Sequence, residues 1–134
     1  MGLKEVCRVV NATRGVELAS SAQVAASFLE RLVGLLGRKG LHPGEGLIIQ
    51  PCNSVHTFLM RFPIDVLFLD AEGTIVHMWS EMPPNRATWV VWAAKRVVEL
   101  PAGTLLATGT RPGERVEIQT KTAGFSNPIY IQRQ

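Results

Sequence analysis

The chain contains little cysteine, and its two cysteines are far apart. Cys7 and Cys52 lie in different parts of the sequence, which excludes a CxxC metal or redox motif. A single disulfide would require an oxidising compartment, whereas two buried free thiols suit a reducing cytosol. We favour the second interpretation.

Long hydrophobic segments are also missing. No apolar run approaches the roughly 20 residues that a transmembrane helix needs. The N-terminus, Met-Gly-Leu-Lys-Glu-Val, lacks the apolar core of a signal peptide. We therefore expect a cytoplasmic protein without a membrane span.

The excess of charge of one sign is small. There are 14 Lys and Arg against 11 Asp and Glu, which gives a formal net charge of +3 and a pI of about 9.2. The basic residues are scattered, whereas nucleic-acid-binding proteins gather them on one face or stripe. We do not expect a nucleic-acid partner.

Motifs that would identify a reaction are absent as well. The sequence contains no GxSxG nucleophile motif, no phosphate-binding glycine loop and no HExxH pair. The potential metal ligands show none of the usual spacings, among them His42, His56, His77, Cys52 and Asp65. We expect neither a metal nor another cofactor, and we favour a protein that is not an enzyme over one that is.

What remains is the composition of an ordinary globular protein. Apolar residues make up 46% of the chain and charged residues 19%. A length of 134 residues suits one domain, which we assign to residues 1–120. Residues 121–134 lack periodicity and contain Gly124 and Pro128, so we predict a loosely ordered tail there.

Short strands dominate the predicted secondary structure. The patterns of apolar residues and turn formers predict strands at 4–10, 16–18, 47–50, 54–60, 64–70, 74–79, 88–92, 97–100 and 115–119. One amphipathic helix is predicted over 22–36, after possible N-caps at Ser20 and Ser21. Residues 105–108 fit either a helical turn or an extended segment. The predicted fold class is α+β, a mainly antiparallel sheet or small β-barrel with one packed helix.

The apolar run at 53–70 contains polar side chains that need partners if they are buried. His56 and Met60 share one face of the predicted strand. Asp65 follows Pro63 near a strand start, where a carboxylate often accepts backbone N–H bonds or pairs with an arginine. Arg31, at the edge of the helix's apolar face, is the natural partner. We prefer this structural role of Asp65 to a ligand-binding or catalytic one.

Two further features allow alternatives. Glu99 either faces solvent or accepts hydrogen bonds from the turn at Ala102-Gly103, and we favour the turn because its N–H groups need acceptors. Trp89 and Trp92 would point to opposite faces of a regular strand. One of them would then be exposed.

A set of short motifs occurs in order over roughly residues 5–119. They read Val-Glu-Leu-Ala at 16–19, Arg-Leu-Val-Gly-Leu at 31–35, Gly-Glu-Gly-Leu-Ile at 44–48, Phe-Leu-Met at 58–60, Ile-Asp-Val-Leu-Phe-Leu-Asp at 64–70, Gly-Thr-Ile-Val at 73–76, Val-Glu-Leu-Pro-Ala-Gly at 98–103 and Pro-Gly-Glu-Arg-Val at 112–116. In this order they resemble the family called domain of unknown function 192, which occurs in bacteria and archaea. Leu59 and Arg61-Phe62 depart from the family's usual Trp and Lys-Asn-Thr around Met60.

The resemblance implies a compact, mainly β domain with a packed helix, and it implies no activity. It supports treating four residues as one set, because they match family motif positions: Arg31, Met60, Asp65 and Glu99. The departures around Met60 imply that any binding surface formed there differs from that of relatives.

Three functions are compatible with the sequence. The first is a non-catalytic module that binds a small anionic or polar ligand, or a peptide, through Arg31, His56, Met60, Asp65 and Glu99, with arginine as a bidentate donor. The second is a hydrolase with His56 or Asp65 as general base. The third is a structural or interaction protein that uses its tail or an exposed tryptophan. Nothing in the sequence indicates an oligomeric state.

Overall fold

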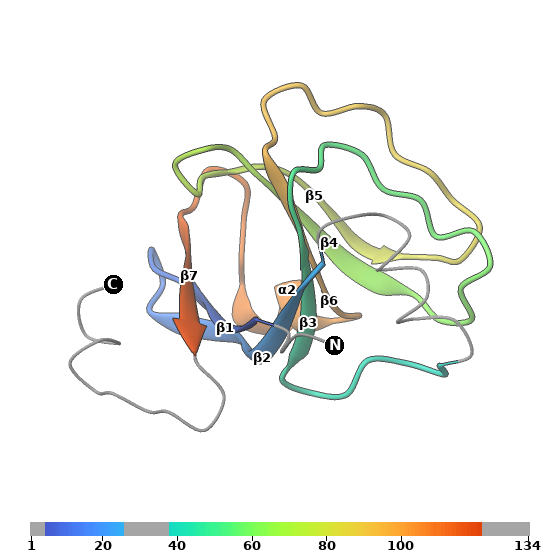
Figure 1. Ribbon diagram of the computed structural model, residues 1–134, viewed down its shortest axis with the longest axis horizontal. Helices are drawn as coiled ribbons and strands as arrows, with labels where there is room; N and C mark the ends of the chain where they lie inside the picture. Colours follow the sequence, from blue (N-terminus) through green and yellow to red (C-terminus); the bar gives the residue numbers. More distant parts are fainter. Residues whose placement is uncertain (1–4, 26–37, 122–134) are drawn as a thin grey trace.

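The computed structural model describes residues 5–25 and 38–121, which form one seven-stranded sheet and a short helix (Figure 1). The elements are β1 (Val6–Asn11), β2 (Val16–Ala25), β3 (Glu45–Ile49), β4 (Ile64–Leu69), β5 (Ile75–Met82), β6 (Arg96–Pro101), α2 (Thr104–Thr108) and β7 (Val116–Lys121). The strand order is β5-β4-β6-β3-β2-β1-β7.

The strands are mainly antiparallel, as predicted. Only the β2–β3 pair among these seven strands is parallel, with Ser21 opposite Glu45 and Ala25 opposite Ile49. β1 lies between β2 and β7, and its pairing with β7 runs from Val6 opposite Lys121 to Asn11 opposite Val116. The α+β fold class is confirmed.

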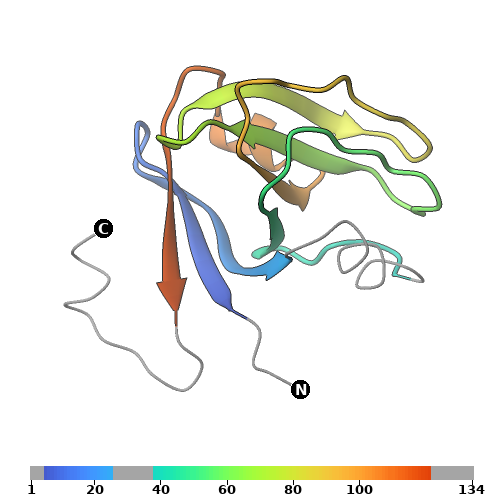
Figure 2. The same ribbon diagram turned by 45° about the horizontal axis from the view of Figure 1, so that its top comes forward.

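The sheet is strongly curved but does not close, so the barrel alternative is wrong. Its edge strands β5 and β7 meet at one end, where Thr74 and Arg115 form an isolated antiparallel bridge. The N–H of Ile75 donates to the carbonyl of Glu114 over 2.8 Å, and that of Val116 to the carbonyl of Gly73 over 2.8 Å. Away from this junction the two edges diverge (Figure 2).

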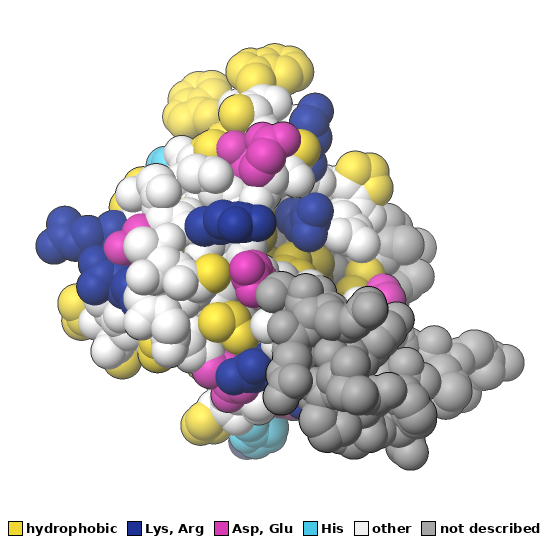
Figure 3. Space-filling model, turned by 90° about the vertical axis from the view of Figure 1, so that its left-hand side faces the viewer, with side chains coloured by type: hydrophobic (Ala, Val, Ile, Leu, Met, Phe, Trp, Pro, Cys, Tyr) yellow, Lys and Arg dark blue, Asp and Glu magenta, His cyan; other side chains and the backbone are white. Residues whose placement is uncertain are grey.

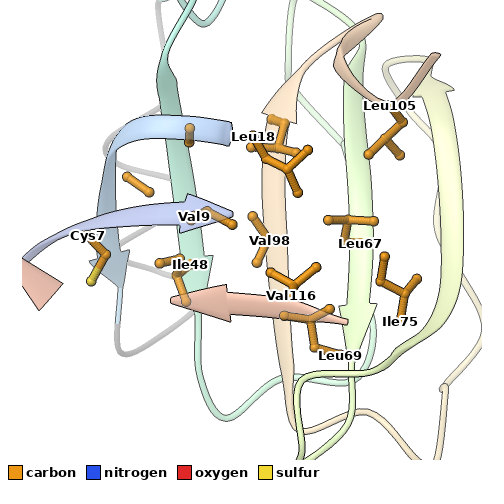
Figure 4. Close-up of a cluster of buried hydrophobic side chains, with 13 residues drawn as sticks. Cys7, Val9, Leu18, Ile48, Leu67, Leu69, Ile75, Val98, Leu105 and Val116 are labelled. Carbon is orange, nitrogen blue, oxygen red and sulfur yellow. The ribbon is translucent and has the colours of Figure 1, made fainter. Parts of the chain in front are cut away.

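Buried side chains form two clusters, and β4 contributes to both. Along β4, Leu67 and Leu69 join the cluster drawn in Figure 4, with Val98, Leu105 and Val116 from other elements. Alternate residues of β4 belong to the second cluster, namely Ile64, Val66 and Phe68. All six residues of β4 are buried, which agrees with a sequence that is apolar at every position except Asp65.

The predicted helix over 22–36 is wrong at its start. Residues 22–25 belong to β2, and Ser20 and Ser21 lie within that strand rather than at a helix cap. Pairing with β3 fixes the extended conformation, because tertiary contacts override local propensity. Residues 26–36 of the prediction lie outside the described residues.

The strands predicted at 54–60 and 88–92 are wrong too. Both segments lie in loops, residues 51–63 and 83–95, which we call the paired loops. Backbone N–H groups of Thr57 and Thr88 donate across the pair to the carbonyls of Arg86 and Val55, each over 2.8 Å. His56 and Ala87 make a single bridge. Leu59 has a φ of +69°, which cannot continue a regular strand.

The remaining boundaries agree broadly with the sequence. Residues 104–108 are helical, which decides the alternative left open at 105–108. The last strand extends to Lys121. Because the predicted tail beyond it lies outside the described residues, the division into a domain at 1–120 and a tail stays a prediction.

Candidate functional site

A pocket of about 420 Å³ opens beside the first of the paired loops. Its walls come from the end of β3, from the start of this loop and from β6, and they are Ile49, Pro51, Cys52, Asn53, Ser54, Val55, His56 and Glu99. The fold therefore brings His56 and Glu99, two of the predicted site residues, to one cavity.

Glu99 reaches the pocket from the middle of the sheet. It lies on β6 opposite Leu47 of β3 and Val66 of β4, and it is fully buried. The solvent-facing alternative is wrong because Glu99 is fully buried, and the N–H of Gly103 in the following turn donates to Asp65. A buried carboxylate in a pocket wall is a strong acceptor for any hydrogen-bond donor that can reach it.

His56 is held by its own loop. Its ring stacks on that of Phe58 with centroids 4.7 Å apart, and its Nδ1 accepts the N–H of Phe58 over 3.3 Å. When the imidazole is neutral, this bond places its proton on Nε2. His56 is half-buried, and its contacts with Phe58 fix the orientation of its ring.

Asp65 has a different environment from the pocket residues. Its Oδ1 accepts the N–H groups of Glu81, over 2.8 Å, and Gly103, over 3.2 Å, and its Oδ2 accepts that of Leu105 over 2.8 Å. The side chain is fully buried. The carboxylate thus ties β4 to β5 and to the start of α2, which is the backbone-accepting alternative raised for it above.

Met60 and Arg31 complete the predicted set. Met60 is buried in the second hydrophobic cluster and is not among the described residues that line the pocket. Arg31 lies outside the described residues, so its proposed pairing with Asp65 is not described either.

Sequence reasoning missed the pocket wall at Cys52, Asn53 and Ser54. Cys52 lies three positions beyond the end of β3 at Ile49, and polar residues shortly after a strand end often form sites. Their position shortly after a strand was the feature of the sequence that could have revealed this pocket wall.

Neither cysteine is in a disulfide among the described residues, as predicted. Cys7 is buried, and burial raises the pKa of its thiol. Cys52 is only half-buried, and its thiol donates to the carbonyl of Ser54 over 3.1 Å. The expectation of two buried thiols therefore holds for Cys7 alone.

Residues 5–25 and 38–121 contain no group of three or more His, Cys, Asp or Glu side chains placed to hold a metal ion. No helix in this part of the chain is both long and apolar enough to cross a bilayer.

Comparison with known proteins identifies the family. The family DUF192, described as Uncharacterized ACR, matches residues 9–118. The chain belongs to the DUF192 family. The resemblance predicted from the ordered motifs is thereby confirmed, and the family brings no established activity.

Relatives of this DUF192 protein match it over most of both chains and are described only as UPF0127 proteins. The UPF0127 protein of Pyrococcus abyssi is 31% identical over 119 residues, which cover 81% of this chain and 95% of the relative. That of Pyrococcus furiosus is 32% identical over 120 residues, covering 81% and 96%.

Solved structures share the DUF192 fold. A Sinorhizobium meliloti protein, provisionally described as a transcription regulator, superposes with a TM-score of 0.71 at 25% identity, over 87% of this chain and 94% of that one. A protein of unknown function from Novosphingobium aromaticivorans gives 0.70 at 19% identity, over 84% and 83%.

Proposed function

We propose that this DUF192 protein is a non-catalytic binding module whose ligand occupies the pocket between the first paired loop and β6. The observation that carries the proposal is the convergence of His56 and a fully buried Glu99 on one cavity. The two residues lie far apart in the sequence, so the fold itself joins them. A buried carboxylate that faces a cavity can accept a hydrogen bond from a ligand.

The pocket suits a small polar molecule or the end of a peptide. A volume of about 420 Å³ lies within the roughly 300–1,000 Å³ range of small-ligand sites. Ile49, Pro51 and Val55 supply apolar walls, while polar groups come from Asn53, Ser54 and the two titratable residues. Such a mixture of apolar walls and few polar groups is typical of selective binding sites.

The five predicted site residues take different parts in this proposal. His56 and Glu99 contact the ligand, and Met60 and Asp65 hold the surrounding structure. Arg31 stays the proposed donor to an anionic ligand group.

A hydrolase is less well supported. Its base would be His56 or Asp65, but both oxygens of Asp65 already accept backbone N–H bonds. A general base needs access to its substrate proton, and a fully buried Asp65 lacks it. His56 alone would then have to carry the chemistry.

A ligand screen that also shows where on the protein a compound binds tests the proposal. Small carboxylates, phosphate esters, amines and short peptides are added to ¹⁵N-labelled protein, and amide shifts are mapped. We expect at least one class to perturb residues 49–56 and 99, and His56→Ala to weaken that binding about tenfold. His42→Ala, an exposed histidine away from the pocket, is the matched control. If no class perturbs these amides, or if both variants bind alike, the proposal fails.

A further inference from the structure

The paired loops carry most of the exposed large hydrophobic side chains that the structure describes. Five of the six lie there: Phe58, Leu59, Trp89, Val90 and Trp92, with only Leu106 elsewhere. Trp89 is 91% exposed and Trp92 82% exposed. Figure 3 shows hydrophobic side chains projecting at the top of the molecule, where Figure 1 places the β5–β6 connection. Fully exposed tryptophans are unusual and mark interaction surfaces.

The paired loops carry formal charge of one sign only. Residues 51–63 and 83–95 contain Arg61, Arg86 and Lys95 and no Asp or Glu. All three basic residues are exposed. Since the chain has 14 basic and 11 acidic residues, these three account for its net charge of +3 and leave the rest neutral, with 11 of each. The projecting apolar side chains are therefore accompanied by the net positive charge of the whole protein.

The backbone of the paired loops is suited to a less polar environment. Across the pair, N–H groups of Thr57, Thr88 and Val91 donate to carbonyls of the opposite loop over 2.8 Å. The hydroxyl of Thr57 donates to the carbonyl of Pro83 over 2.6 Å, and the N–H of Val55 donates to the hydroxyl of Thr88 over 2.9 Å. Backbone groups satisfied in this way lower the cost of leaving bulk water.

We infer that the paired loops dock this protein on an anionic lipid surface, with Trp89 and Trp92 in the interfacial layer. Tryptophan prefers the headgroup level of a bilayer, and apolar burial combined with attraction to anionic lipids is how peripheral proteins bind. The positive charge complements such a surface. Residues 53–56 belong both to the first paired loop and to the pocket wall, so docking places the pocket next to the membrane. The inference does not depend on the proposed ligand.

Co-sedimentation of the full chain with vesicles tests this docking. The probe is phosphatidylcholine vesicles with about one third phosphatidylserine, against pure phosphatidylcholine. We expect binding to the anionic vesicles that falls as salt is raised from about 0.05 to 0.5 M. The double variant Trp89→Ala/Trp92→Ala should bind about tenfold more weakly or worse, while Leu106→Ala, the exposed hydrophobic control, binds as the wild type does. Circular dichroism confirms that each variant is folded.

Two further experiments test the contribution of the basic residues to binding and the depth of the tryptophans in the bilayer. Arg86→Gln/Lys95→Gln should lose about fivefold in binding per cation, and Lys39→Gln/Arg111→Gln, which removes two exposed cations elsewhere, should lose less. Quenching of tryptophan fluorescence by brominated lipid should be strong in the wild type and largely absent in the double tryptophan variant, where Trp79 remains.

Three outcomes would overturn the inference. One is failure of the wild-type protein to bind anionic vesicles at low salt. Another is equal binding by the double tryptophan variant and Leu106→Ala. The third is dimerisation in solution that the tryptophan substitutions abolish without any vesicle binding, which would make the loops a contact between two copies of the chain.

Discussion

At the scale of single residues, Asp65 shows how one buried carboxylate can organise several elements. Three backbone N–H groups from two separate segments converge on its two oxygens. The peptide dipoles of these N–H groups supply positive potential that offsets part of the cost of burying the carboxylate.

Asp65→Asn should therefore destabilise the fold rather than act on ligands alone. The amide keeps one acceptor oxygen and turns an NH₂ group toward N–H donors, so we expect a loss of about 2–4 kcal/mol in the free energy of unfolding. Urea unfolding measures it. Asp70→Asn is the matched control, since Asp70 accepts two backbone N–H bonds in a half-buried turn and should cost less. Equal losses in the two variants would contradict the central role of Asp65.

Glu114 makes a second carboxylate-centred cluster, at the surface. Hydrogen bonds lower the pKa of Glu114 from 4.5 to about 2. The largest effect comes from the Arg14 guanidinium and the next from the Asn11 amide. Arg14 Nε lies 2.7 Å from Oε2 and Asn11 Nδ2 lies 3.0 Å from Oε1. The cluster links the β1–β2 turn to the segment before β7.

This depressed pKa predicts a specific pH dependence. The folded state favours the charged carboxylate, so the stabilisation is complete above about pH 4.5 and is lost as pH falls toward 2. Glu114→Gln should be less stable than the wild type at neutral pH, and the difference should shrink on acidification through that window. Urea midpoints between pH 7 and pH 2 measure it. A difference that stays constant with pH would rule the cluster out as its source.

At the scale of elements, the apolar pattern predicted a strand correctly where the strand's own residues are nearly all apolar and buried. β4 was found because every residue from 64 to 69 is buried and apolar except Asp65. The second half of β2, Ser-Ala-Gln-Val-Ala at 21–25, has no strand signal of its own. Its conformation depends on pairing with β3, in which Ser21 lies opposite Glu45 and Ala25 opposite Ile49, and local periodicity carries no information about such pairing.

The candidate site was predictable only in part for a related reason. His56 and Glu99 stood out as polar residues in apolar segments, and both line the pocket. The wall at 52–54 results from the path of an irregular loop, which no periodicity encodes. Both tryptophans are exposed, although a regular strand would have exposed only one of them, because residues 88–92 lie in an irregular loop.

The junction between the sheet edges depends on a glycine. Gly73 has a φ of +87°, and a Cβ there would lie 2.5 Å from the carbonyl oxygen of Val116. Gly73→Ala should cost about 2–4 kcal/mol of stability. Gly15→Ala, with a φ of +67° and nothing within 4 Å, is the control for backbone strain alone and should cost about 1 kcal/mol. Comparable thermal unfolding of the two variants would show that the close contact does not matter.

At the scale of the whole molecule, burial is greatest in the middle of the sheet. β4 and β6 lie side by side, each flanked by another strand, and all of β4 is buried. Hydrogen exchange should therefore be slowest in β4 and β6, where amides open only with global unfolding. Amides of the paired loops should exchange faster despite their cross-loop bonds, because the loops lie at the surface. Equal protection of loops and central strands would contradict this order.

The pairing of β1 with β7 has a consequence for synthesis of the chain on the ribosome. Roughly 100 residues separate the two strands, so at typical translation rates β7 emerges about 5–20 s after β1. Throughout that interval the outer edge of β1 has no neighbouring strand, and its N–H and C=O groups are open to pairing with other nascent chains. A chaperone that shields the first hairpin would therefore have several seconds in which to act.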